Sequence, residues 1–341
     1  MKKLTALLLT CLLLLAGCSA AEDGTAASFA PAEENRLVIY TSHKEEVYWP
    51  IIKEFEERTG IWVDVVSGGT NELLARIERE KDSPRADVMF GGGVESLESR
   101  RGLFTPYRCA EADSLLVRYC SPEDLWTPFS ALPTVLIYNT KLMAPGALTG
   151  WADLLSPELK GQIAFADPSI SGSAFTGLVT LLSALGGDWE ETLHAFARNL
   201  DGAQLDSSGA VLTAVAGGTC LAGVTLEDTA LQRIAAGADI AVVYPEDGTS
   251  AVPDGSALVK GAPHEDNAKR FLDFTAGADV QRLLVDRFYR RSVRSDIAPA
   301  GDLPSLSDIP MTYYDAARAS QQHDAILMTW AFYLGGEEES E

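Results

Sequence analysis

Serine and glycine residues stand at two places before a helical pattern, the first of them after a strand-like apolar run. The first is Ser171-Gly172-Ser173-Ala174 and the second is Ser207-Ser208. Free backbone N–H groups at a helix start, with serine hydroxyls beside them, suit the binding of an anion. Serines also cap ordinary helices at this position, and on these residues alone capping is the favoured interpretation.

Four further loops also follow strand-like runs. Ligands of open α/β sheets bind beyond the carboxyl ends of the strands, so these loops are candidate binding segments. Most of their residues are small, hydroxyl-bearing or glycine, which favours a small-molecule cleft. The loops are Thr41-Ser42-His43, Gly68-Gly69-Thr70, Gly91-Gly92-Gly93 and Thr225-Leu226-Glu227-Asp228.

Charged side chains near these loops have two interpretations each. Glu227 and Asp228 would suit an ammonium group of a ligand, and they are equally the acids expected in the first turn of a helix. No loop contains an obvious buried arginine. Arg290 and Arg291 would supply positive charge to the cleft, or they are ordinary surface residues.

Alternating strand and helix patterns must position these loops. Strand-like runs at residues 37–40, 62–66 and 87–90 alternate with helical patterns, the first of which has Val47, Ile51 and Phe55 on one face. This spacing predicts βαβ units and a largely parallel sheet. A second α/β unit is predicted after residue 130, and the tail over residues 309–334 is predicted to be helical. The strand-like runs of the second unit are 135–138, 163–166, 220–225 and 240–244.

The N-terminus has the order of a secretory signal, in which Lys2 and Lys3 precede an apolar run and small residues. The apolar run is too short to span a bilayer as a helix. Its ending, Leu15-Ala16-Gly17-Cys18, resembles the bacterial lipobox, which implies removal of residues 1–17 and acylation of Cys18. An ordinary signal with an incidental cysteine is the alternative. Residues 18–35 are too polar to bury a core, so they are expected to form a flexible tether.

Length and charge narrow the class of protein. About 300 residues remain after the tether, which is long for one core and predicts two lobes. The net charge of −22 makes nucleic acid an improbable partner, because such binding rests on neutralising phosphates with Lys and Arg. No later segment has the length and apolarity of a membrane span.

Three cysteines remain after the signal and the anchor are set aside. Cys109 and Cys120 flank a short polar segment, and an exported protein meets oxidising conditions, so we predict a disulfide between them. Cys220 lies in an apolar run and is expected to be a buried, inert thiol.

The order and spacing of several stretches resemble the type II periplasmic solute-binding proteins of ABC importers. The similarity covers most of residues 36–300 and is strongest to the branch that binds ferric iron, phosphonates, sugar phosphates and thiamine. It rests on LVIYTSHKE from residue 37, FEERTGI from 55, TNEL from 70, ADV from 86, WADL from 151, LKGQIA from 159 and PSISGSA from 168.

The resemblance implies a periplasmic-binding-protein-like II fold, in which two doubly wound α/β lobes are joined by a hinge of crossing strands and close on a ligand. The chain is expected to cross near Ser130, Glu246 and Arg291. Lobe 1 would comprise residues 36–129 and 247–291, and lobe 2 residues 130–246 and 292–335.

The resemblance also implies roles for the loops. In this branch the position of Ser171–Ala174 holds a phosphate, a phosphonate or a synergistic anion, and with the resemblance anion contact becomes the favoured interpretation. Ser207, Ser208 and Thr70 would act in the same way. His43 matches a histidine that binds ferric iron in some relatives, and hard ferric iron prefers oxygen ligands beside it. The glutamate of those sites is replaced by glycine near Gly92, and their adjacent tyrosines are replaced near Glu227.

His43 is therefore expected to hydrogen-bond an organic or phosphorylated ligand, or to cap a helix. The candidate ligand contacts are Thr41, Ser42, His43, Gly69, Thr70, Gly92, Ser130, Ser171, Gly172, Ser173, Ala174, Ser207, Ser208, Glu227 and Asp228.

Two other classes of protein compete with this interpretation. An exported hydrolase would need a catalytic motif, but Gly-x-Ser-x-Gly, His-Glu-x-x-His and Cys-x-x-Cys do not occur. A structural or receptor lipoprotein does not explain the glycine and serine loops. We expect a monomeric lipoprotein that is anchored to the cell membrane and faces the periplasm or the exterior. It would need no cofactor and would deliver a small anionic or zwitterionic solute, with a phosphate- or phosphonate-bearing compound favoured, to an ABC permease. A ferric-iron-binding protein of the same family is the main alternative.

Overall fold

The computed structural model describes residues 31–301 and 303–335 of the chain. The predicted signal, Cys18 and most of the predicted tether lie outside these residues. The end of the tether is more structured than predicted: Glu33–Asn35 form a 3₁₀ turn. The side-chain amide of Asn267 donates to the carbonyls of Glu34 and Arg36, which fixes this turn to the protein.

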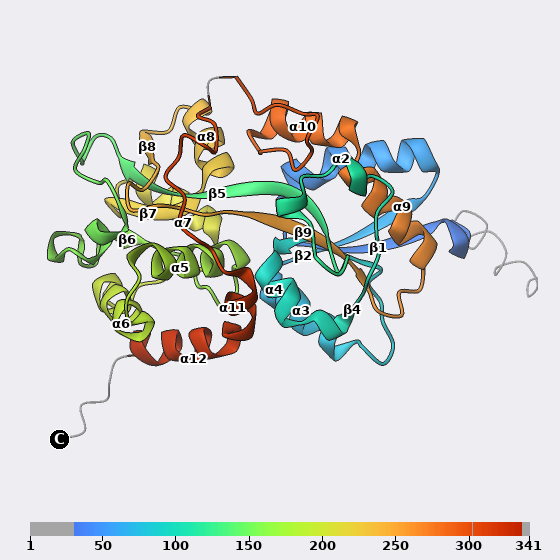
Figure 1. Ribbon diagram of the computed structural model, residues 1–341, viewed down its shortest axis with the longest axis horizontal. Coiled ribbons are helices and arrows are strands. Elements are labelled where there is room, and N and C mark those ends of the chain that lie inside the picture. The colour runs from blue at the N-terminus through green and yellow to red at the C-terminus, as the bar shows by residue number, and fades with distance from the viewer. Residues whose placement is uncertain (1–30, 302, 336–341) are drawn as a thin grey trace, which may run out of the picture.

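Two α/β lobes lie side by side, and two long strands run between them (Figure 1). In the first lobe, β1 pairs in parallel with β2 and β3, and β9 pairs antiparallel with β3. The parallel part of this sheet is what the βαβ spacing predicts. Its elements are β1 (Arg36–Thr41), α2 (Glu45–Thr59), β2 (Trp62–Ser67), α3 (Thr70–Arg79), β3 (Val88–Gly93), α4 (Val94–Ser99), β4 (Phe104–Thr105), β9 (Ala251–Val259), α9 (Glu265–Ala276) and α10 (Ala278–Phe288).

The second lobe is built on β5, which pairs antiparallel with β7 and β8, while β6 pairs in parallel with β7. Its elements are β5 (Thr127–Asn139), β6 (Ile163–Ala164), α5 (Gly172–Leu185), α6 (Trp189–Leu200), α7 (Ser208–Ala216), β7 (Ala222–Leu226), α8 (Glu227–Ala235) and β8 (Ile240–Val243). Short 3₁₀ turns occupy Arg101–Leu103, Ala112–Ser114, Val117–Tyr119, Trp151–Leu155 and Pro157–Leu159.

Each lobe has its own apolar core. In the first lobe α2 buries Val47, Ile51 and Phe55, the face predicted from their four-residue spacing, and Gly60 ends the helix in the left-handed region at φ 72°. In the second lobe the rings of Phe165 and Phe196 pack edge to face with centroids 5.1 Å apart. Burial of these two cores is what stabilises the lobes.

Two strands pass between the lobes. All thirteen residues of β5 are buried, and β5 pairs with β9 from Thr127 to Pro133. Ser130 lies opposite Asp254 in this ladder. A third passage follows α10, where the Ala131 amide donates to the carbonyl of Arg291. Ser130 and Arg291 were named as crossing positions, and β9 begins a few residues beyond the third, Glu246. The lobe boundaries drawn at these positions stay predictions.

The tail is helical only in part. Residues 309–315 are extended or irregular, and two short helices follow, α11 (Ala316–Gln321) and α12 (His323–Leu334). The side chain of Asp315 caps α11 by accepting from the Arg318 amide, so the helix begins there and not at residue 309. Trp330 packs into the core of the second lobe, while Asp324 pairs with Arg100 of the first. The tail therefore touches both lobes.

The cysteines differ from their predicted states. Cys109 is buried and Cys120 half-buried in one small apolar cluster, but both are free thiols, so the predicted disulfide is absent from this structure. The Cys120 thiol instead donates to the carbonyl of Leu116 at 3.5 Å. Burial raises the pKa of Cys109 to about 11, which disfavours its reactive thiolate. Cys220 is half-buried, just before β7. Among the described residues, no helix is long and apolar enough to cross a membrane.

Candidate functional site

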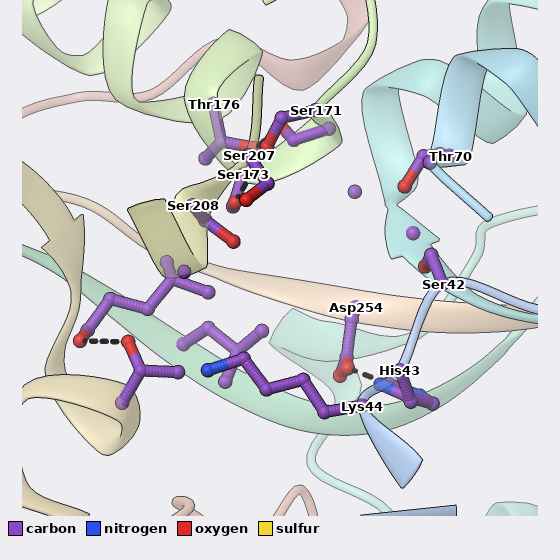
Figure 2. Close-up of a pocket in the computed structure, with 18 of the residues that line it drawn as sticks. Ser42, His43, Lys44, Thr70, Ser171, Ser173, Thr176, Ser207, Ser208 and Asp254 are labelled. Carbon is purple, nitrogen blue, oxygen red and sulfur yellow. Dashed lines mark hydrogen bonds and ion pairs between the residues drawn. The ribbon is translucent and has the colours of Figure 1, made fainter. Parts of the chain in front are cut away.

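A cavity of about 470 Å³ lies between the lobes, where loops at the strand ends face one another. In Figure 2 the hydroxyl groups of Ser171, Ser173, Ser207 and Ser208 gather on one side. Thr70 lies opposite them, at the start of α3. The cavity has the volume of a small-molecule site, and it forms where parallel sheets bind their ligands.

Two helices of the second lobe begin at this cavity. Ser171 caps α5 by accepting from the Ala174 amide at 3.3 Å, and its hydroxyl lies 3.1 Å from that of Ser173. Ser207 caps α7 in the same way through the Ala210 amide, also at 3.3 Å. Both serines are thus helix caps and cavity residues at once, so the two predicted roles do not exclude each other.

The backbone of these helix starts retains donors. The N–H groups of Gly172 and Ser173 make no hydrogen bond with the described part of the protein, and the same holds for Ser208. Unpaired N–H groups carry the positive end of the helix dipole. Because α5 has 14 residues and α7 has 9, both present a full dipole to the cavity. This side of the cavity therefore favours a negative group.

The first lobe completes this anion-favouring side. Thr70 is the first residue of α3, which has 10 residues and begins after Gly69. Gly92 packs against it at φ 116°, where a Cβ would come 2.8 Å from the Thr70 methyl group. Both features require glycine at position 92. Three helix starts from two lobes thus converge on one space.

The floor of the cavity holds a buried charged network that joins the crossing strands. Arg290 donates to Asp254 Oδ2 and to the Ser130 hydroxyl, each at 2.9 Å, and its Nε lies 3.0 Å from Asp228 Oδ2. Two carboxylates therefore surround one guanidinium. The Ser130 amide also donates to Asp254, at 2.7 Å. This network fixes Arg290 in place, and its charge is balanced within the protein.

His43 lies above this network. Its Nε2 is 3.6 Å from Asp254 Oδ2 and makes no hydrogen bond with the described residues. Burial, followed by the charge of Arg290, holds the pKa of His43 well below its usual value, so the ring is neutral. Thr41 orients this residue, because its hydroxyl accepts from the His43 amide and donates to the Phe90 carbonyl. A neutral ring suits hydrogen bonding to a polar group.

Glu227 does not reach the cavity. Arg291 holds its carboxylate with two hydrogen bonds of 2.8 Å, and Tyr244 donates a third. The residue is fully buried. The Glu227 carboxylate is therefore not free to contact the ammonium group of a ligand as predicted, because it is already paired with the guanidinium of Arg291.

Most of the predicted contacts line the cavity. They are Ser42, His43, Gly69, Thr70, Gly92, Ser171, Gly172, Ser173, Ser207, Ser208 and Asp228. The other four lie behind it. Thr41 and Ser130 position His43 and Arg290, Ala174 is buried in α5 with its amide on the Ser171 cap, and Glu227 is paired as described.

Several lining residues were not predicted. They are Lys44, Glu72, Thr176, Asp206, Gln232 and Asp254. Lys44 precedes α2, and its side chain points into the cavity in Figure 2. Its ammonium forms no ion pair with the described residues. The position of Lys44 directly after His43, in a predicted binding loop, was a local signal for a cation in the cavity.

The two lobes touch beside the cavity. The side-chain amide of Asn71 donates to the Pro168 carbonyl at 3.1 Å. A Cβ at Gly69 would come 2.6 Å from the carbonyl oxygen of Ile170, so the backbones meet closely there. The Thr176 hydroxyl on α5 donates to Glu95 on α4. These contacts describe a closed cleft.

The residue types of a ferric-iron site are dispersed. Tyr313 and Tyr314 line a second hollow of about 1110 Å³, next to α4 and α11, and neither lines the cavity of His43. Within residues 31–301 and 303–335, no three His, Cys, Asp or Glu side chains are grouped as a metal site. His43 is neutral and lies over an arginine.

Comparison with known proteins identifies the class. Residues 83–322 match the model of the bacterial extracellular solute-binding protein family, and the chain belongs to this family. A Haemophilus influenzae relative, named only as an uncharacterized protein, is 30% identical. The alignment covers 90% of this chain and 93% of the length of the relative. Iron uptake protein A1 of Synechocystis is 26% identical, and the alignment covers 83% of this chain and 82% of the length of that protein.

A solved structure shares the fold. The periplasmic binding protein AfuA of Actinobacillus pleuropneumoniae, solved with fructose-6-phosphate, superimposes with a TM-score of 0.81 at 23% identity. The match covers 88% of this chain and 99% of AfuA. The predicted type II fold of the periplasmic binding proteins is thereby confirmed.

The protein is therefore an exported solute-binding protein of an ABC import system and not an enzyme. Such proteins bind a small solute outside the cytoplasm and pass it to a membrane permease. The family assignment confirms the predicted class, and the geometry of the cavity bears on which solute is bound.

Proposed function

We propose that the chain captures a small solute bearing a phosphate or phosphonate group and delivers it to its permease. The convergence of α3, α5 and α7 on one cavity carries this proposal. The unpaired amides and hydroxyls of Ser171–Ser173 and Ser207–Ser208 supply donors for the oxygens of a tetrahedral anion. Lys44 adds a positive charge without a carboxylate partner in the described protein.

The opposite end of the cavity is suited to polar groups in the part of the solute that does not carry the phosphate. Asp228 and Asp254 are almost fully buried around Arg290, and the neutral His43 faces them. Carboxylates accept hydrogen bonds from hydroxyl or ammonium groups. A sugar phosphate, whose hydroxyls are several bonds from its phosphate, satisfies both ends, and so does a zwitterionic aminophosphonate. AfuA was solved with a sugar phosphate, which agrees with this choice.

The mechanism that we propose is closure of two lobes, with the predicted boundaries 36–129 and 247–291 for lobe 1 and 130–246 and 292–335 for lobe 2. The contact between Gly69 and Ile170 and that between Asn71 and Pro168 would form on closing and enclose the solute. Closure excludes water, and the hydrogen bonds to the anion are stronger in the drier site. Opening of the same contacts would release the solute.

We also propose that Cys18 carries a lipid anchor and that the protein acts as a monomer. The Leu15-Ala16-Gly17-Cys18 ending supports the anchor. Tethering near the permease would raise the effective concentration of loaded carrier. Mass spectrometry of the membrane-bound protein tests the anchor through the acyl mass on an N-terminal Cys18. An unmodified N-terminus at another residue would contradict the lipid anchor. The molar mass of the mature chain from light scattering tests the monomeric state.

A thermal-shift screen tests the choice of solute. A ligand that binds only the folded state raises the melting temperature, by an amount that grows with the ratio of its concentration to Kd. Sugar phosphates and phosphonates are expected to stabilise the protein, while the corresponding sugars without phosphate are not. Stabilisation by ferric iron or ferric citrate alone would contradict this proposal and indicate a ferric-iron-binding protein instead.

A further inference from the structure

Glu95 is a fully buried carboxyl group at the contact between the lobes. It lies on α4 of lobe 1, and its Oε1 accepts a hydrogen bond from the Thr176 hydroxyl on α5 of lobe 2. Thr176 and Gly93 both line the solute cavity. A Cβ placed on Gly93 would come 2.8 Å from Glu95 Oε1, so the carboxyl group lies directly behind the cavity wall.

Among the described residues, no cation contributes to the shift in the pKa of Glu95. The group that faces it from the tail is the buried phenol of Tyr314. Other charged groups near α4 are engaged elsewhere. Arg100 pairs with Asp324 at 3.0 Å, and Glu98 accepts from the Trp126 indole. The ring of His323, at the start of α12, is kept neutral because burial lowers its pKa.

Electrostatics then favours the neutral acid. Burial raises the pKa of Glu95, and the hydroxyl groups of Thr176 and Tyr314 oppose this only in part. An ionised carboxylate without a cation in a dry contact is costly. A carboxylate beside the start of α5 would also repel an anion held there. A protonated Glu95 avoids both costs.

We propose that Glu95 takes up one proton when the lobes close on an anionic solute and returns it when they open. In the closed protein α5 covers the carboxyl group, whereas opening separates Glu95 from Thr176 and admits water, which stabilises the carboxylate. The proton comes from solvent and returns to solvent. This inference rests on the proposed closure around an anion. Glu95 does not touch the solute, so it is a positioning residue.

The sign of the pH dependence follows from linkage. The pKa of Glu95 is higher in the closed protein than in the open one, so closure gains stability that is fully present below the open-state pKa. That gain disappears as pH rises through the closed-state pKa. With one coupled proton, the affinity for solute falls by up to about tenfold per pH unit in this range. Uptake from an acidic exterior would be favoured.

Titration calorimetry at a series of pH values tests the inference, with fructose-6-phosphate as the probe. Three proteins are compared: wild type, Glu95→Gln and Glu98→Gln. Glutamine keeps the shape of Glu95 without its titration, and Glu98→Gln removes the same charge one turn along α4. Taking the ratio of wild-type Kd to Glu95→Gln Kd at each pH cancels the titration of the probe and of other side chains.

The expected ratio rises with pH and levels off at acidic pH, while Glu98→Gln follows wild type. A constant ratio across pH would overturn the inference. Infrared difference spectra of the saturated proteins, wild type minus Glu95→Gln, give a second readout. They should contain the carbonyl band of a neutral carboxylic acid at neutral pH, and a carboxylate band in its place would also overturn the inference.

Failure of the proposed solute class is distinguishable from failure of this inference. If wild type and Glu98→Gln bind no phosphate compound at any pH, the solute class is wrong. The pH series and the infrared measurement are then run with whichever solute the thermal screen finds, because closure brings Glu95 and Thr176 together in the same way. Thermal unfolding of Glu95→Gln without solute confirms that the variant is folded.

Discussion

Replacement of Gly69 by alanine should weaken solute binding without destabilising the fold. Gly69 has φ −68° and ψ 148°, which any residue adopts, so alanine causes no backbone strain within lobe 1. Its Cβ would however lie 2.6 Å from the Ile170 carbonyl oxygen and 2.8 Å from the Ile170 Cγ2 atom across the cleft. Ordinary contacts begin near 3.4 Å, so the lobes of Gly69→Ala cannot close fully.

The expected loss follows from the cost of overpacking. Forcing one extra methyl group into a packed contact costs about 1–3 kcal/mol. This cost falls only on the closed, binding-competent state, so it appears directly in the affinity. Binding should therefore weaken by about 5- to 150-fold. In the unfolded chain alanine has less conformational freedom than glycine, so stability of the open protein should be unchanged or raised, by about 0.4–1 kcal/mol at most.

Calorimetric Kd values and melting temperatures without solute measure the two effects separately. Gly102→Ala is the matched control, because a Cβ there meets nothing within 4 Å. It should bind as wild type does. Wild-type affinity in Gly69→Ala would refute the reasoning, since the lobes would then close without bringing Gly69 against Ile170. A loss of affinity that is matched by a lower melting temperature would refute it too.

Three further outcomes follow from the described contacts. Replacing Ser171 and Ser173 together by alanine should weaken phosphate binding about tenfold, since two hydroxyl donors are lost, and an unchanged calorimetric Kd removes this loop from the site. Glu227→Gln leaves its buried arginine partner uncompensated and should lower the free energy of unfolding in urea by about 3–5 kcal/mol; a loss below 1 kcal/mol would show that the pair is not buried in solution. Burial lowers the pKa of His264, but the hydrogen bond and charge of Asp87 outweigh it and raise the pKa overall. The stability from this pair is therefore complete below about pH 6.5 and disappears as pH rises through the higher folded pKa, so the stability gap between wild type and His264→Gln should shrink from pH 6 to pH 9.

The parts of the site that were predicted from sequence are those with a local signal. A strand-like run, then serine or glycine, then a helical pattern is enough to place the starts of α3 and α5. The helix cap at Ser171 follows from the same short stretch. Ser207 and Ser208 before a helical pattern place the start of α7. Because the loops before α3 and α5 follow strand ends, their convergence was also predictable from the topology of α/β sheets. The loop before α7 follows α6 instead, and Leu205 in it makes only an isolated bridge with Ala166.

The parts that were missed depend on pairing across long distances in the chain. Asp254 follows Pro253 and precedes Gly255, residues that argue against a strand, yet the three lie in β9 because β5 pairs with them. Arg290 was named as a source of positive charge for the cleft, with an ordinary surface residue as the alternative. Only the fold decides between the two, because it buries Arg290 against Asp228 and Asp254. Glu227 and Asp228 are neighbours in sequence with different roles, which only the positions of the two arginines distinguish.

The packing of Trp330 has a consequence for how the chain reaches its native state after export. Its ring lies 5.6 Å from that of Phe165 and completes a core whose strands all precede residue 244. The sheet of the first lobe likewise needs β9, which comes after every strand of the second. A chain that crosses a membrane from its N-terminus therefore cannot finish the second core until its last helix has emerged, and it cannot finish the first until β9, α9 and α10 have emerged. Because each core needs segments from late in the chain, we expect both lobes to fold only after most of the polypeptide has been exported.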